Sequence, residues 1–404
     1  MISHDDIHIC HITTVHSWDD IRIFQRMCSS LAEKGLRVTL VAPVKKETVV
    51  RGIRLIPTGL HGKLARMCGV VTLLPLLWRL RGQLYHFHDP ELLPWMTLLQ
   101  ALMPWASFVY DVHEYHAETV VTQSYFRCHQ LDFMASKLFA RLEPLLAKRL
   151  HGVIGVTTPI ADRFRGGGAR VAVIRNVVNV NAIPKGSDPT CFNHEMLENK
   201  IHLLVLGGTI DVGRCMAELV VAIGLLKQRG LQLYLLCMGD PFPTEMGDRL
   251  LALAEESGIG GQVCFKGKIP FAQYQQHIAQ SRLGMVLYAP SINNSMGVPN
   301  RLYEFMAHGI PIIASDYPEV AKVVRDAECG LLVDTSSTRL LADAMEYLLT
   351  HPVEAARMGA NGRRAIEEKY NWNSEFQALL DFYGELLDKN LHEDSRSPTT
   401  QVLK

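Results

Sequence analysis

Two side chains that can bind a phosphorylated sugar lie one helical turn apart in the C-terminal half. Arg301 comes two residues after Pro299 and Glu304 follows three residues later, on the same face of a short predicted helix that ends at Gly309. A helix start favours an anion, and a guanidinium group can donate two hydrogen bonds to one phosphate. A carboxylate can accept both hydroxyls of a ribose. The spacing would suit a nucleoside-diphosphate site, although for such a pair in isolation an Arg301–Glu304 ion pair on a solvated helix face is the more common arrangement.

The sequence around this pair is more specific than the pair itself. From Pro299 to Ser315 it follows the pattern P-x-(K/R)-x-x-E-(Y/F)-M-A-x-G-x-P-(V/I)-I-A-S almost continuously. This segment resembles the donor-site helix of the GT-B-fold glycosyltransferases of the family 4 type. The resemblance implies an α/β fold of two Rossmann-like domains, whose parallel sheets face each other across a cleft. It also implies a nucleoside-diphosphate sugar bound mainly to the second domain. Many members have a first glutamate at the position of Met296.

A second phosphate-binding element is predicted at the start of the C-terminal half. The predicted strand 201–206 is followed by two glycines, the second of which is Gly208, and Arg214 lies at the entrance of the next helix. Glycine lets a backbone approach a phosphate closely. The family usually has a basic pair on this turn, and Thr209 takes the first of its positions. We expect Arg214 and Arg301 to neutralise one departing nucleoside diphosphate without a metal ion.

The segment 289–297 is predicted to be a loop whose amides meet the donor sugar. Asn293 and Asn294 are polar substitutes beside Met296, although both are also common turn formers. The complete set of predicted donor-binding residues is Gly208, Thr209, Arg214, Asn293, Asn294, Met296, Gly297, Asn300, Arg301 and Glu304.

Polar residues at strand ends of the N-terminal half form the predicted acceptor side. The carboxyl ends of parallel strands meet at one edge of a sheet, and residues 88–93 and 110–114 follow or end two predicted strands there. These stretches resemble the family's H-D-x-E-L-L and Y-D-x-H-E sequences, which implies that His88 faces the transferred sugar. Without the resemblance, each histidine is more often a hydrogen-bonded strand-end residue than a catalyst.

Six residues form the predicted acceptor site and four have predicted catalytic roles. The acceptor-binding residues are His16, Asp20, Arg22, Asp89, His113 and Glu114. The catalytic residues are His88, Arg214, Arg301 and Glu304. Asp20 is an equally good helix N-cap.

We predict no metal ion and no cofactor other than the nucleotide-sugar substrate. The sequence contains neither HExxH nor DxD, and its first predicted β-α-β unit lacks the G-x-G-x-x-G of nicotinamide and flavin enzymes. The loop 13–22 replaces that glycine sequence.

The composition is that of a two-domain protein without a global charge. The chain has 404 residues, and its 41 Lys and Arg balance its 41 Asp and Glu, so nothing favours nucleic acid as a partner. The nine cysteines are scattered without CxxC pairs, as reduced core thiols are, which favours a cytoplasmic location. No secretory signal is recognised, and the apolar run 70–78 is too short to span a bilayer.

Two β-α-β series give the predicted domain order, the first beginning at residue 7 and the second at 201. The predicted regions are 1–182 for the acceptor domain, 183–200 for a linker, 201–372 for the donor domain, 373–390 for a helix returning to the first domain and 391–404 for a disordered tail.

Two segments, 60–81 and 133–149, mix basic with apolar residues. Such helices can lie on an anionic membrane surface, or they can pack on the sheet with basic outer faces. The family's frequent use of lipid-linked acceptors favours peripheral contact with the inner face of the cell membrane.

These observations favour a metal-independent glycosyltransferase that moves a sugar from a nucleoside diphosphate to an acceptor hydroxyl. Family resemblance implies retention of the anomeric configuration and a role in bacterial surface polysaccharide or glycolipid synthesis. A sugar-nucleotide 2-epimerase of the same fold is one alternative. A glycosyltransferase-like binding partner without turnover is another, because Met296 and Thr209 depart from the family pattern.

Overall fold

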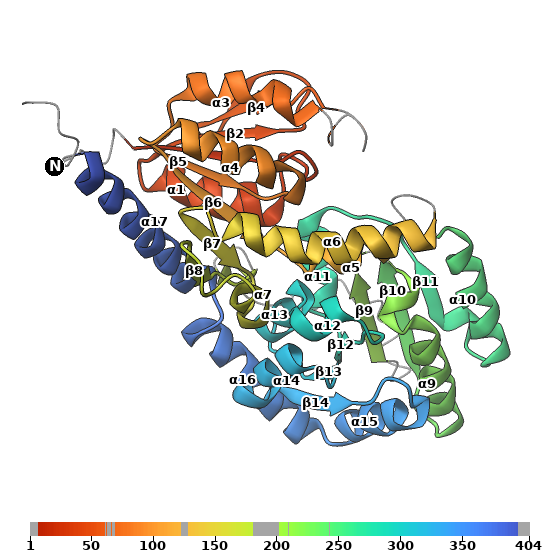
Figure 1. Cartoon of the computed structure of the whole chain (residues 1–404). Helices are drawn as coiled ribbons and strands as arrows, with labels where there is room; N and C mark the ends of the chain where they lie inside the picture. The colour runs from red at the N-terminus through yellow and green to blue at the C-terminus, as the bar shows by residue number, and fades with distance from the viewer. Residues whose placement is uncertain are drawn as a thin grey trace, which may run out of the picture. The chain divides into compact units, whose positions relative to one another are not determined.

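The computed structural model describes residues 7–60, 62, 66, 69–122, 128–180, 202–208, 210–241 and 243–394 (Figure 1). Contacts divide the chain into two compact units. Unit 1 comprises Met1–Asn176 and Asn373–Lys404, and unit 2 comprises Val177–Trp372. The predicted linker 183–200 lies outside the described residues, and so does Thr209.

Unit 1 is built on an eight-stranded sheet with the order β3-β4-β2-β1-β5-β6-β7-β8. Its strands are β1 (His8–Ile12), β2 (Arg37–Ala42), β3 (Thr48–Val50), β4 (Ile53–Pro57), β5 (Leu84–Phe87), β6 (Ser107–Val112), β7 (Gly152–Gly155) and β8 (Arg170–Val173). All neighbours pair in parallel except β3 and β4, which are antiparallel. The central strands β1, β5 and β6 are buried along their whole length, as strands covered on both faces are.

The helices of unit 1 connect these strands. They are η2 (Ile21–Cys28), α1 (Ser29–Glu33), η3 (Val70–Leu73), α3 (Leu74–Leu80), η4 (Pro90–Leu92), α4 (Leu93–Leu102), α5 (His116–Thr122), α6 (His129–Ala147), α7 (Thr158–Asp162) and the long α17 (Trp372–Asp394). The predicted helix after the first strand is present, and its first two turns form the π-helix η2.

Helix α17 belongs to unit 1 although it ends the chain. Phe382 and Leu386 pack so closely on β7 that a Cβ on Gly152 would lie 2.7 Å from Phe382 and 2.9 Å from Leu386. Ser107 donates a hydrogen bond to the carbonyl oxygen of Leu386. The helix continues to Asp394, beyond its predicted end at 390; residues 395–404 of the predicted tail lie outside the described residues.

Unit 2 contains two three-stranded parallel sheets, with the orders β11-β10-β9 and β12-β13-β14. Its strands are β9 (His202–Gly207), β10 (Leu233–Met238), β11 (Val263–Phe265), β12 (Gly284–Val286), β13 (Ile312–Ser315) and β14 (Gly330–Val333). The two sheets share one core, in which Leu204 of β9, Met285 of β12 and Ile313 of β13 belong to the same buried cluster. Both units are therefore α/β with parallel sheets, and the predicted fold class is confirmed.

Helices surround the sheets of unit 2. They are η7 (Val212–Arg214), α9 (Met216–Gln228), α10 (Glu245–Glu256), η8 (Gly260–Gln262), α11 (Phe271–Ile278), α12 (Ile292–Met296), α13 (Asn300–Ala307), α14 (Pro318–Ala327), α15 (Thr338–Thr350) and α16 (Pro352–Glu368). The predicted helix between Pro299 and Gly309 is α13. Pro299 is its N-cap residue and Gly309, with φ +68, follows its C-cap.

Two local predictions differ from the structure. The antiparallel β3–β4 hairpin was not predicted; Arg51 and Gly52, both at positive φ, form its turn. The segment 289–297 contains helix α12 and is not a loop throughout. Ser291 caps α12 by accepting a hydrogen bond from the backbone N–H of Asn294 at 3.0 Å.

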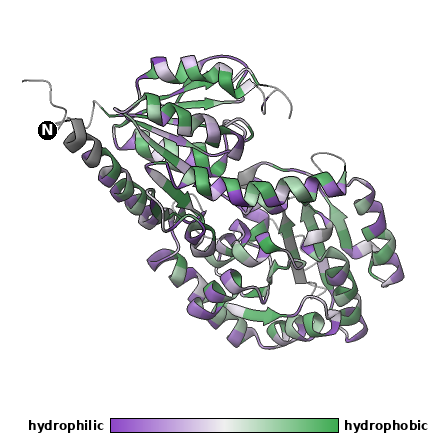
Figure 2. Cartoon of the chain, viewed as in Figure 1, coloured by the Kyte–Doolittle hydropathy of each residue, from purple (hydrophilic) through white to green (hydrophobic). Residues whose placement is uncertain are grey.

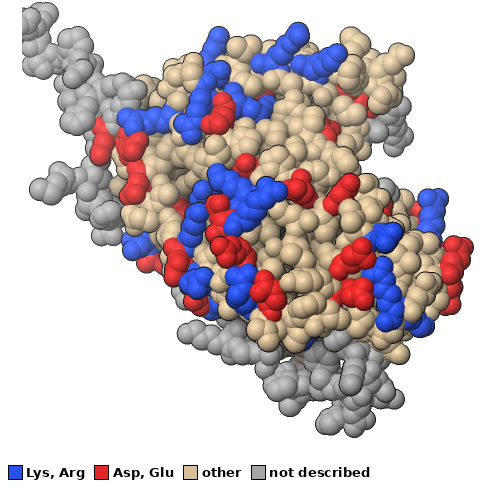
Figure 3. Space-filling view, turned by 90° about the horizontal axis from the view of Figure 1, so that it is seen from below, with Lys and Arg blue, Asp and Glu red and all other residues tan. Residues whose placement is uncertain are grey.

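The strands of both units are mostly hydrophobic, whereas the helices carry residues of both kinds (Figure 2). On the face drawn in Figure 3, lysine and arginine are interspersed with aspartate and glutamate, in keeping with the balanced composition. Among the described residues, every helix is too short or too polar to cross a bilayer.

Candidate functional site

The backbone turn after β9 brings the two predicted phosphate-binding arginines together. Gly208 follows β9 with φ +86, a left-handed conformation that glycine adopts without strain. A Cβ built on Gly208 would lie 3.3 Å from Nη2 of Arg301 and 3.8 Å from Nη2 of Arg214. Gly239 after β10 is equally restricted, because a Cβ there would lie 1.8 Å from the carbonyl oxygen of Gly208. Two guanidinium groups therefore flank one exposed glycine.

Tyr288 lies beside both guanidinium groups and is hydrogen-bonded to that of Arg214. Its hydroxyl accepts a hydrogen bond from Nη1 of Arg214 at 3.0 Å, and its ring centroid lies 5.0 Å from Cζ of Arg214 and 5.9 Å from Cζ of Arg301. The Tyr288 backbone is itself fixed, since its N–H donates to Oγ of Ser315 and its carbonyl accepts from Thr335. Burial raises the pKa of Tyr288, and the nearby Arg214 offsets this only partly.

Arg301 and Glu304 occupy α13 as predicted, but its face is not solvated. Each residue is only 9 % exposed, so the alternative of an ion pair on a solvated face is wrong. Oε2 of Glu304 accepts a hydrogen bond from the hydroxyl of Tyr274 on α11 at 3.0 Å. Burial and the adjacent Glu304 carboxylate raise the pKa of Tyr274, so this phenol stays protonated and donates.

The other predicted donor residues lie around the start of α13. Asn294 donates from Nδ2 to the carbonyl oxygen of Ala289 at 2.7 Å and thereby holds the start of α12. Gly297 donates from its backbone N–H to the carbonyl oxygen of Asn293 at 2.8 Å. Met296 ends α12, and Asn300 is the first residue of α13. At least one of the two asparagines of α12, Asn294, therefore has a structural role.

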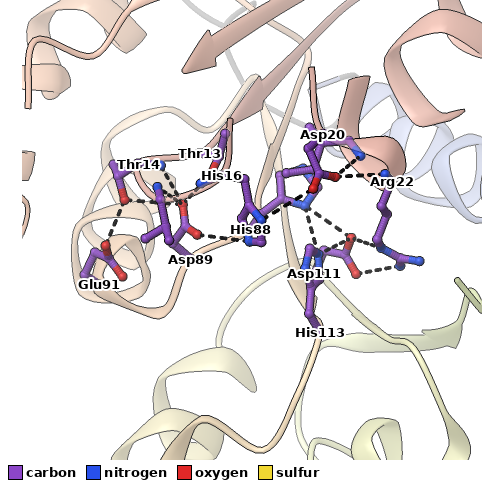
Figure 4. Close-up of polar contacts among 12 residues, drawn as sticks. Thr13, Thr14, His16, Asp20, Arg22, His88, Asp89, Glu91, Asp111 and His113 are labelled. Carbon is purple, nitrogen blue, oxygen red and sulfur yellow. Dashed lines mark hydrogen bonds and ion pairs between the residues drawn. The ribbon is translucent and has the colours of Figure 1, made fainter. Parts of the chain in front are cut away.

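In unit 1, Asp111 at the end of β6 is the centre of a buried polar cluster (Figure 4). Arg22 donates to both of its carboxylate oxygens, from Nε at 2.9 Å and from Nη2 at 2.8 Å. Nε2 of His113 lies 3.1 Å and Nδ1 of His88 lies 3.2 Å from Oδ2 of Asp111. Burial alone would raise the pKa of Asp111, but Arg22 and His113 hold it well below its ordinary value. Asp111 is therefore an anion, and it fixes three side chains.

Arg22 and His88 are located differently from the prediction. Arg22 lies in the first turn of η2, 3 % exposed, and its guanidinium faces Asp111 and the carbonyl oxygen of Ile174. It is placed to hold Asp111 and not to meet a sugar at the surface. His88 is 1 % exposed, and its Nε2 lies 3.1 Å from Nδ1 of His11. Burial lowers the pKa of His88 well below the ordinary value, so it is a neutral imidazole at physiological pH.

Asp89 is also buried, and it organises the loop after β1. Its Oδ2 accepts hydrogen bonds from the backbone N–H of Thr14 at 2.6 Å and from the hydroxyl of Thr13 at 2.9 Å. The hydroxyl of Thr14 also donates to Oε1 of Glu91 at 2.8 Å. With 2 % exposure, Asp89 serves first to shape this loop.

Four predicted acceptor residues remain partly accessible, namely His16, Asp20, His113 and Glu114. The side chain of His16 is 32 % exposed and that of His113 is 18 % exposed, and their ring centroids are 5.1 Å apart. Asp20 caps η2 by accepting from the N–H groups of Arg22 and Ile23, so its N-cap role is confirmed. Burial alone would lower the pKa of His16, but its contact with Asp20 and the charge of Asp89 outweigh burial and raise it.

Glu114 lies just beyond β6, with its side chain 44 % exposed. It accepts a hydrogen bond from the hydroxyl of Thr119 at 2.7 Å and lies 3.7 Å from Nδ1 of His116. Burial alone would raise the pKa of Glu114, but these contacts lower it. Among the predicted acceptor residues, His16, His113 and Glu114 are therefore the ones placed to meet a ligand.

Two groups of side chains in the described part of the chain could offer three ligand atoms to a metal ion. They are His11 with His86 and His88, and His88 with Asp111 and His113. In the second group the nitrogens of His88 and His113 lie 3.2 Å and 3.1 Å from Oδ2 of Asp111. In the first group Nδ1 of His11 lies 3.1 Å from Nε2 of His88, whereas the buried Nε2 atoms of His11 and His86 have no hydrogen-bond partner among the described residues. The Arg22 guanidinium next to Asp111 also opposes a second cation. The chemistry of the second group therefore suits a hydrogen-bonded cluster better than a metal centre.

Tyr288, Tyr274 and Asp111 were missed by sequence reasoning as site residues. Tyr288 and Asp111 lie at the carboxyl ends of predicted parallel strands, which is the signal that could have found them. Tyr274 gave no signal, because it lies within a helix that only the tertiary fold brings to Glu304.

The fold of this chain resembles that of several proteins of solved structure. The chain superimposes on sucrose-phosphate synthase of Thermosynechococcus elongatus with a TM-score of 0.73 and 19 % identity, covering 95 % of this chain and 100 % of that one. It superimposes on the Anabaena protein HepE, in complex with UDP and glucose, with a TM-score of 0.69 and 14 % identity, covering 94 % and 100 % of the chains. The fold is therefore that of the GT-B glycosyltransferases.

Two family models match the sequence, one in each half. The model described as Glycosyl transferases group 1 matches residues 216–365, and the one described as Glycosyltransferase Family 4 matches residues 22–182. The chain belongs to this family of GT-B glycosyltransferases.

Two curated relatives illustrate the range of similarity. A D-inositol 3-phosphate glycosyltransferase of Rhodococcus erythropolis is 33 % identical over 159 residues, which are 39 % of this chain and 35 % of the relative. A phosphatidyl-myo-inositol mannosyltransferase of Mycobacterium leprae is 26 % identical over 370 residues, 89 % of this chain and 90 % of the relative. The chain thus spans about a third of the first relative's length and nine tenths of the second's.

Proposed function

We propose that this protein transfers a sugar from a nucleoside-diphosphate sugar to an acceptor hydroxyl without a metal ion. One observation carries the proposal, namely the two guanidinium groups of Arg214 and Arg301 beside the exposed Gly208 turn. A diphosphate at this turn would meet two cations and the backbone of a left-handed glycine. Glu304, on the same helix face as Arg301, would bind the ribose hydroxyls.

The two arginines would act mainly in the transition state. As the bond between the anomeric carbon and the phosphate oxygen breaks, negative charge accumulates on the departing diphosphate. Fixed guanidinium groups stabilise that charge more than they stabilise the bound donor, which lowers the barrier. Met296, Gly297, Asn293, Asn294 and Asn300 lie near the start of α13, where the sugar of the donor would lie.

We propose retention of the anomeric configuration by attack from the side that the diphosphate leaves. The acceptor oxygen forms its bond to the anomeric carbon while the phosphate oxygen departs with the bonding electrons and receives the acceptor proton. His113 and His16, which are partly exposed, would orient the acceptor. His88, buried beside His11 and Asp111, would contribute by supporting His113 and not through direct contact of its imidazole with sugar.

The acceptor that we favour is a membrane glycolipid or lipid-linked saccharide at the inner face of the cell membrane. Support comes from the relative that matches over most of both chains, which is named as a phosphatidyl-myo-inositol mannosyltransferase. The D-inositol 3-phosphate glycosyltransferases support a phosphorylated polyol as the smaller alternative within the same reaction class.

The first experiment is a binding screen followed by a turnover assay. UDP, GDP, ADP and dTDP are added separately, and the nucleotide that raises the melting temperature identifies the base, because a ligand that binds the native state stabilises it. The matching nucleotide sugar is then incubated with and without a lipid extract. Acceptor-dependent release of the nucleoside diphosphate supports transfer.

Two other outcomes separate the rival functions. Conversion of the nucleotide sugar to an isomer without any acceptor would indicate a 2-epimerase. Tight donor binding with no release of nucleotide under any acceptor would indicate a binding partner and overturn the proposed turnover.

A further inference from the structure

Helix α6 has its polarity inverted relative to an ordinary surface helix. Both of its acids, Asp132 and Glu143, are buried, each 1 % exposed. Glu143 accepts hydrogen bonds from Tyr110 on β6 at 3.0 Å and from Arg163 at 2.7 Å. Polar contacts therefore help to hold α6 against the unit, together with the ring contact of Phe139 with His116, where a surface helix normally uses mainly leucines.

Most large apolar side chains of α6 are exposed to solvent, whereas Phe139 and Leu146 are partly buried. Five of the exposed side chains recur at helical spacing and are between 44 % and 66 % exposed, namely Leu131, Met134, Leu138, Leu142 and Leu145. Helix α4, which packs beside α6, exposes Leu98 and Leu102 in the same range. Single exposed apolar residues are ordinary, but five in one stripe on one helix mark an interaction surface.

The charges beside this stripe are all positive on α6 itself. Lys137 and Arg141 are exposed along one side of it, and Arg149 follows the helix. The hollow at the end of α6 is lined by Lys148, Arg149, His151 and Arg170 among others, and Arg170 is paired there with the exposed Glu385. Because both acids of α6 are turned inward, its outward face combines leucines with cations.

We propose that the outward face of α6 docks unit 1 on an anionic phospholipid surface. An interfacial helix buries its apolar face at the boundary between headgroups and acyl chains, and its cations contact anionic headgroups. A second copy of this chain would cover the leucines but would bring the basic rows of two α6 helices together. Charge complementarity therefore favours lipid over a symmetric dimer.

The sequence alone left open whether residues 133–149 contact a membrane or pack on the sheet with a basic outer face. The structure satisfies both descriptions, because the helix packs in part through its polar residues and leaves its apolar stripe outside. The docking proposal rests on the proposed function in one respect, namely that an enzyme with a membrane acceptor must contact the membrane. Vesicle binding is measured without substrates, so the docking proposal and the proposed function can be disproved independently.

The test is co-sedimentation of the full chain with vesicles of phosphatidylcholine alone and with about one third phosphatidylglycerol. We expect binding to the anionic vesicles to be at least tenfold tighter, because each of several bases near an anionic surface contributes about fivefold. Binding that falls as salt is raised would agree with this attraction.

Two double variants separate the apolar and the charged contributions. Leu138→Gln with Leu145→Gln should reduce binding to anionic vesicles at least about tenfold. Lys137→Glu with Arg141→Glu should reduce it by at least about tenfold as well, and it should abolish the preference for anionic lipid. All four side chains are exposed, so melting temperature should stay within a few degrees.

Matched controls come from exposed residues of unit 2. Leu340→Gln with Val353→Gln removes two apolar side chains that are 51 % and 85 % exposed, and Lys268→Glu with Arg339→Glu reverses two exposed bases. Neither control should change vesicle binding.

Three results would overturn the proposal. They are no binding of the unchanged chain to anionic vesicles, equal binding to neutral and anionic vesicles, or equal loss in the controls and the α6 variants. Light scattering adds a fourth, since a dimer that only the leucine variant converts to a monomer would assign the face to a second copy of the chain.

Discussion

The polar clusters of the two units differ in how their charges are satisfied. In unit 1, Asp111 is fully buried and Arg22 neutralises it with two hydrogen bonds. In unit 2, Arg214 donates to the neutral hydroxyl of Tyr288, and its charge and that of Arg301 lie beside a bare glycine. The first arrangement stabilises a fold and positions a few surface histidines. The second concentrates positive charge where a polyanion can approach.

The comparison predicts that substitutions in the two clusters have different consequences. Substitutions around Asp111 should reduce stability first and activity as a result. Substitutions of the arginines in unit 2 should reduce ligand binding and turnover with a smaller effect on the fold.

The largest effect is expected for Arg301→Ala. We propose that Arg301 stabilises the departing diphosphate, so loss of this fixed cation should lower turnover by about 100- to 1,000-fold. Arg301→Lys should be intermediate, because an ammonium group cannot donate the paired hydrogen bonds of a guanidinium. Nucleotide release measures the rate, and circular dichroism checks that unit 2 is folded.

The matched control for this prediction is Arg325→Ala on α14, whose guanidinium is exposed and pairs with Asp316. Its turnover should stay within about twofold of the unchanged enzyme. Full turnover of the Arg301→Ala variant would remove α13 from the proposed donor site.

The second effect concerns stability. Asp111→Asn leaves the Arg22 guanidinium buried without its counter-charge, which should cost about 3–5 kcal/mol of unfolding free energy. Asp316→Asn breaks an exposed ion pair with Arg325 and should cost less than about 1 kcal/mol. Urea unfolding followed by far-UV circular dichroism suits the measurement, since Asp111 lies in unit 1 and Asp316 in unit 2 and both units contain helices and strands. Equal losses in the two variants would contradict the comparison.

The third effect is acid sensitivity, which should be greater in unit 1. Burial lowers the pKa of His8 to about 4 and also lowers the pKa values of His11, His86 and His88. Below pH 6.5 these histidines bind protons in the unfolded chain but remain neutral in the folded protein. The free energy of unfolding therefore falls as the pH is lowered. His16 opposes the trend, because its raised pKa adds stability that is present below pH 6.5 and lost as pH rises through its folded value.

A histidine whose pKa is lowered to about 4 should cost about 2 kcal/mol at pH 5. In the described part of unit 2, His277 and His308 show lowered pKa values, so its loss should be smaller. Hydrogen exchange at pH 7.5 and pH 5 can follow both units. A greater loss of protection in unit 2 than in unit 1 would contradict the prediction.

The smallest effect tests the Gly208 turn with a matched glycine. Gly208 and Gly230 both have φ +86, but a Cβ on Gly230 would meet nothing within 4 Å. Alanine at either position should cost about 1–2 kcal/mol through backbone strain. Only Gly208→Ala should also weaken nucleotide binding, because its methyl group would press on Arg301. Equal nucleotide affinity of the two variants would argue against a ligand at this turn.

The sequence was sufficient for the parallel strands and for α13, because their signals are local. The apolar run before Gly207 and Gly208 identifies β9, the run between Gly230 and Gly239 identifies β10, and Pro299 with Gly309 delimits α13. The β3–β4 hairpin was missed because its strands are short and polar residues interrupt them.

The site was predicted less completely, because a sequence motif does not show whether its side chains are buried. His88, Asp89 and Arg22 have the residue types of ligand-binding groups, but tertiary packing turns them inward. Asp111 lay within a recognised motif and was not recognised as its centre. Only the register of β1, β5 and β6 shows that His11, His86 and Asp111 lie on neighbouring strands.

The most direct test is an isothermal titration of the cognate nucleoside diphosphate into the unchanged protein and its Arg214→Ala, Arg301→Ala and Arg325→Ala variants. If both guanidinium groups bind one diphosphate, each of the first two variants should raise Kd at least about tenfold, while Arg325→Ala should leave it unchanged. An unchanged Kd in either the Arg214 or the Arg301 variant would contradict a shared diphosphate site.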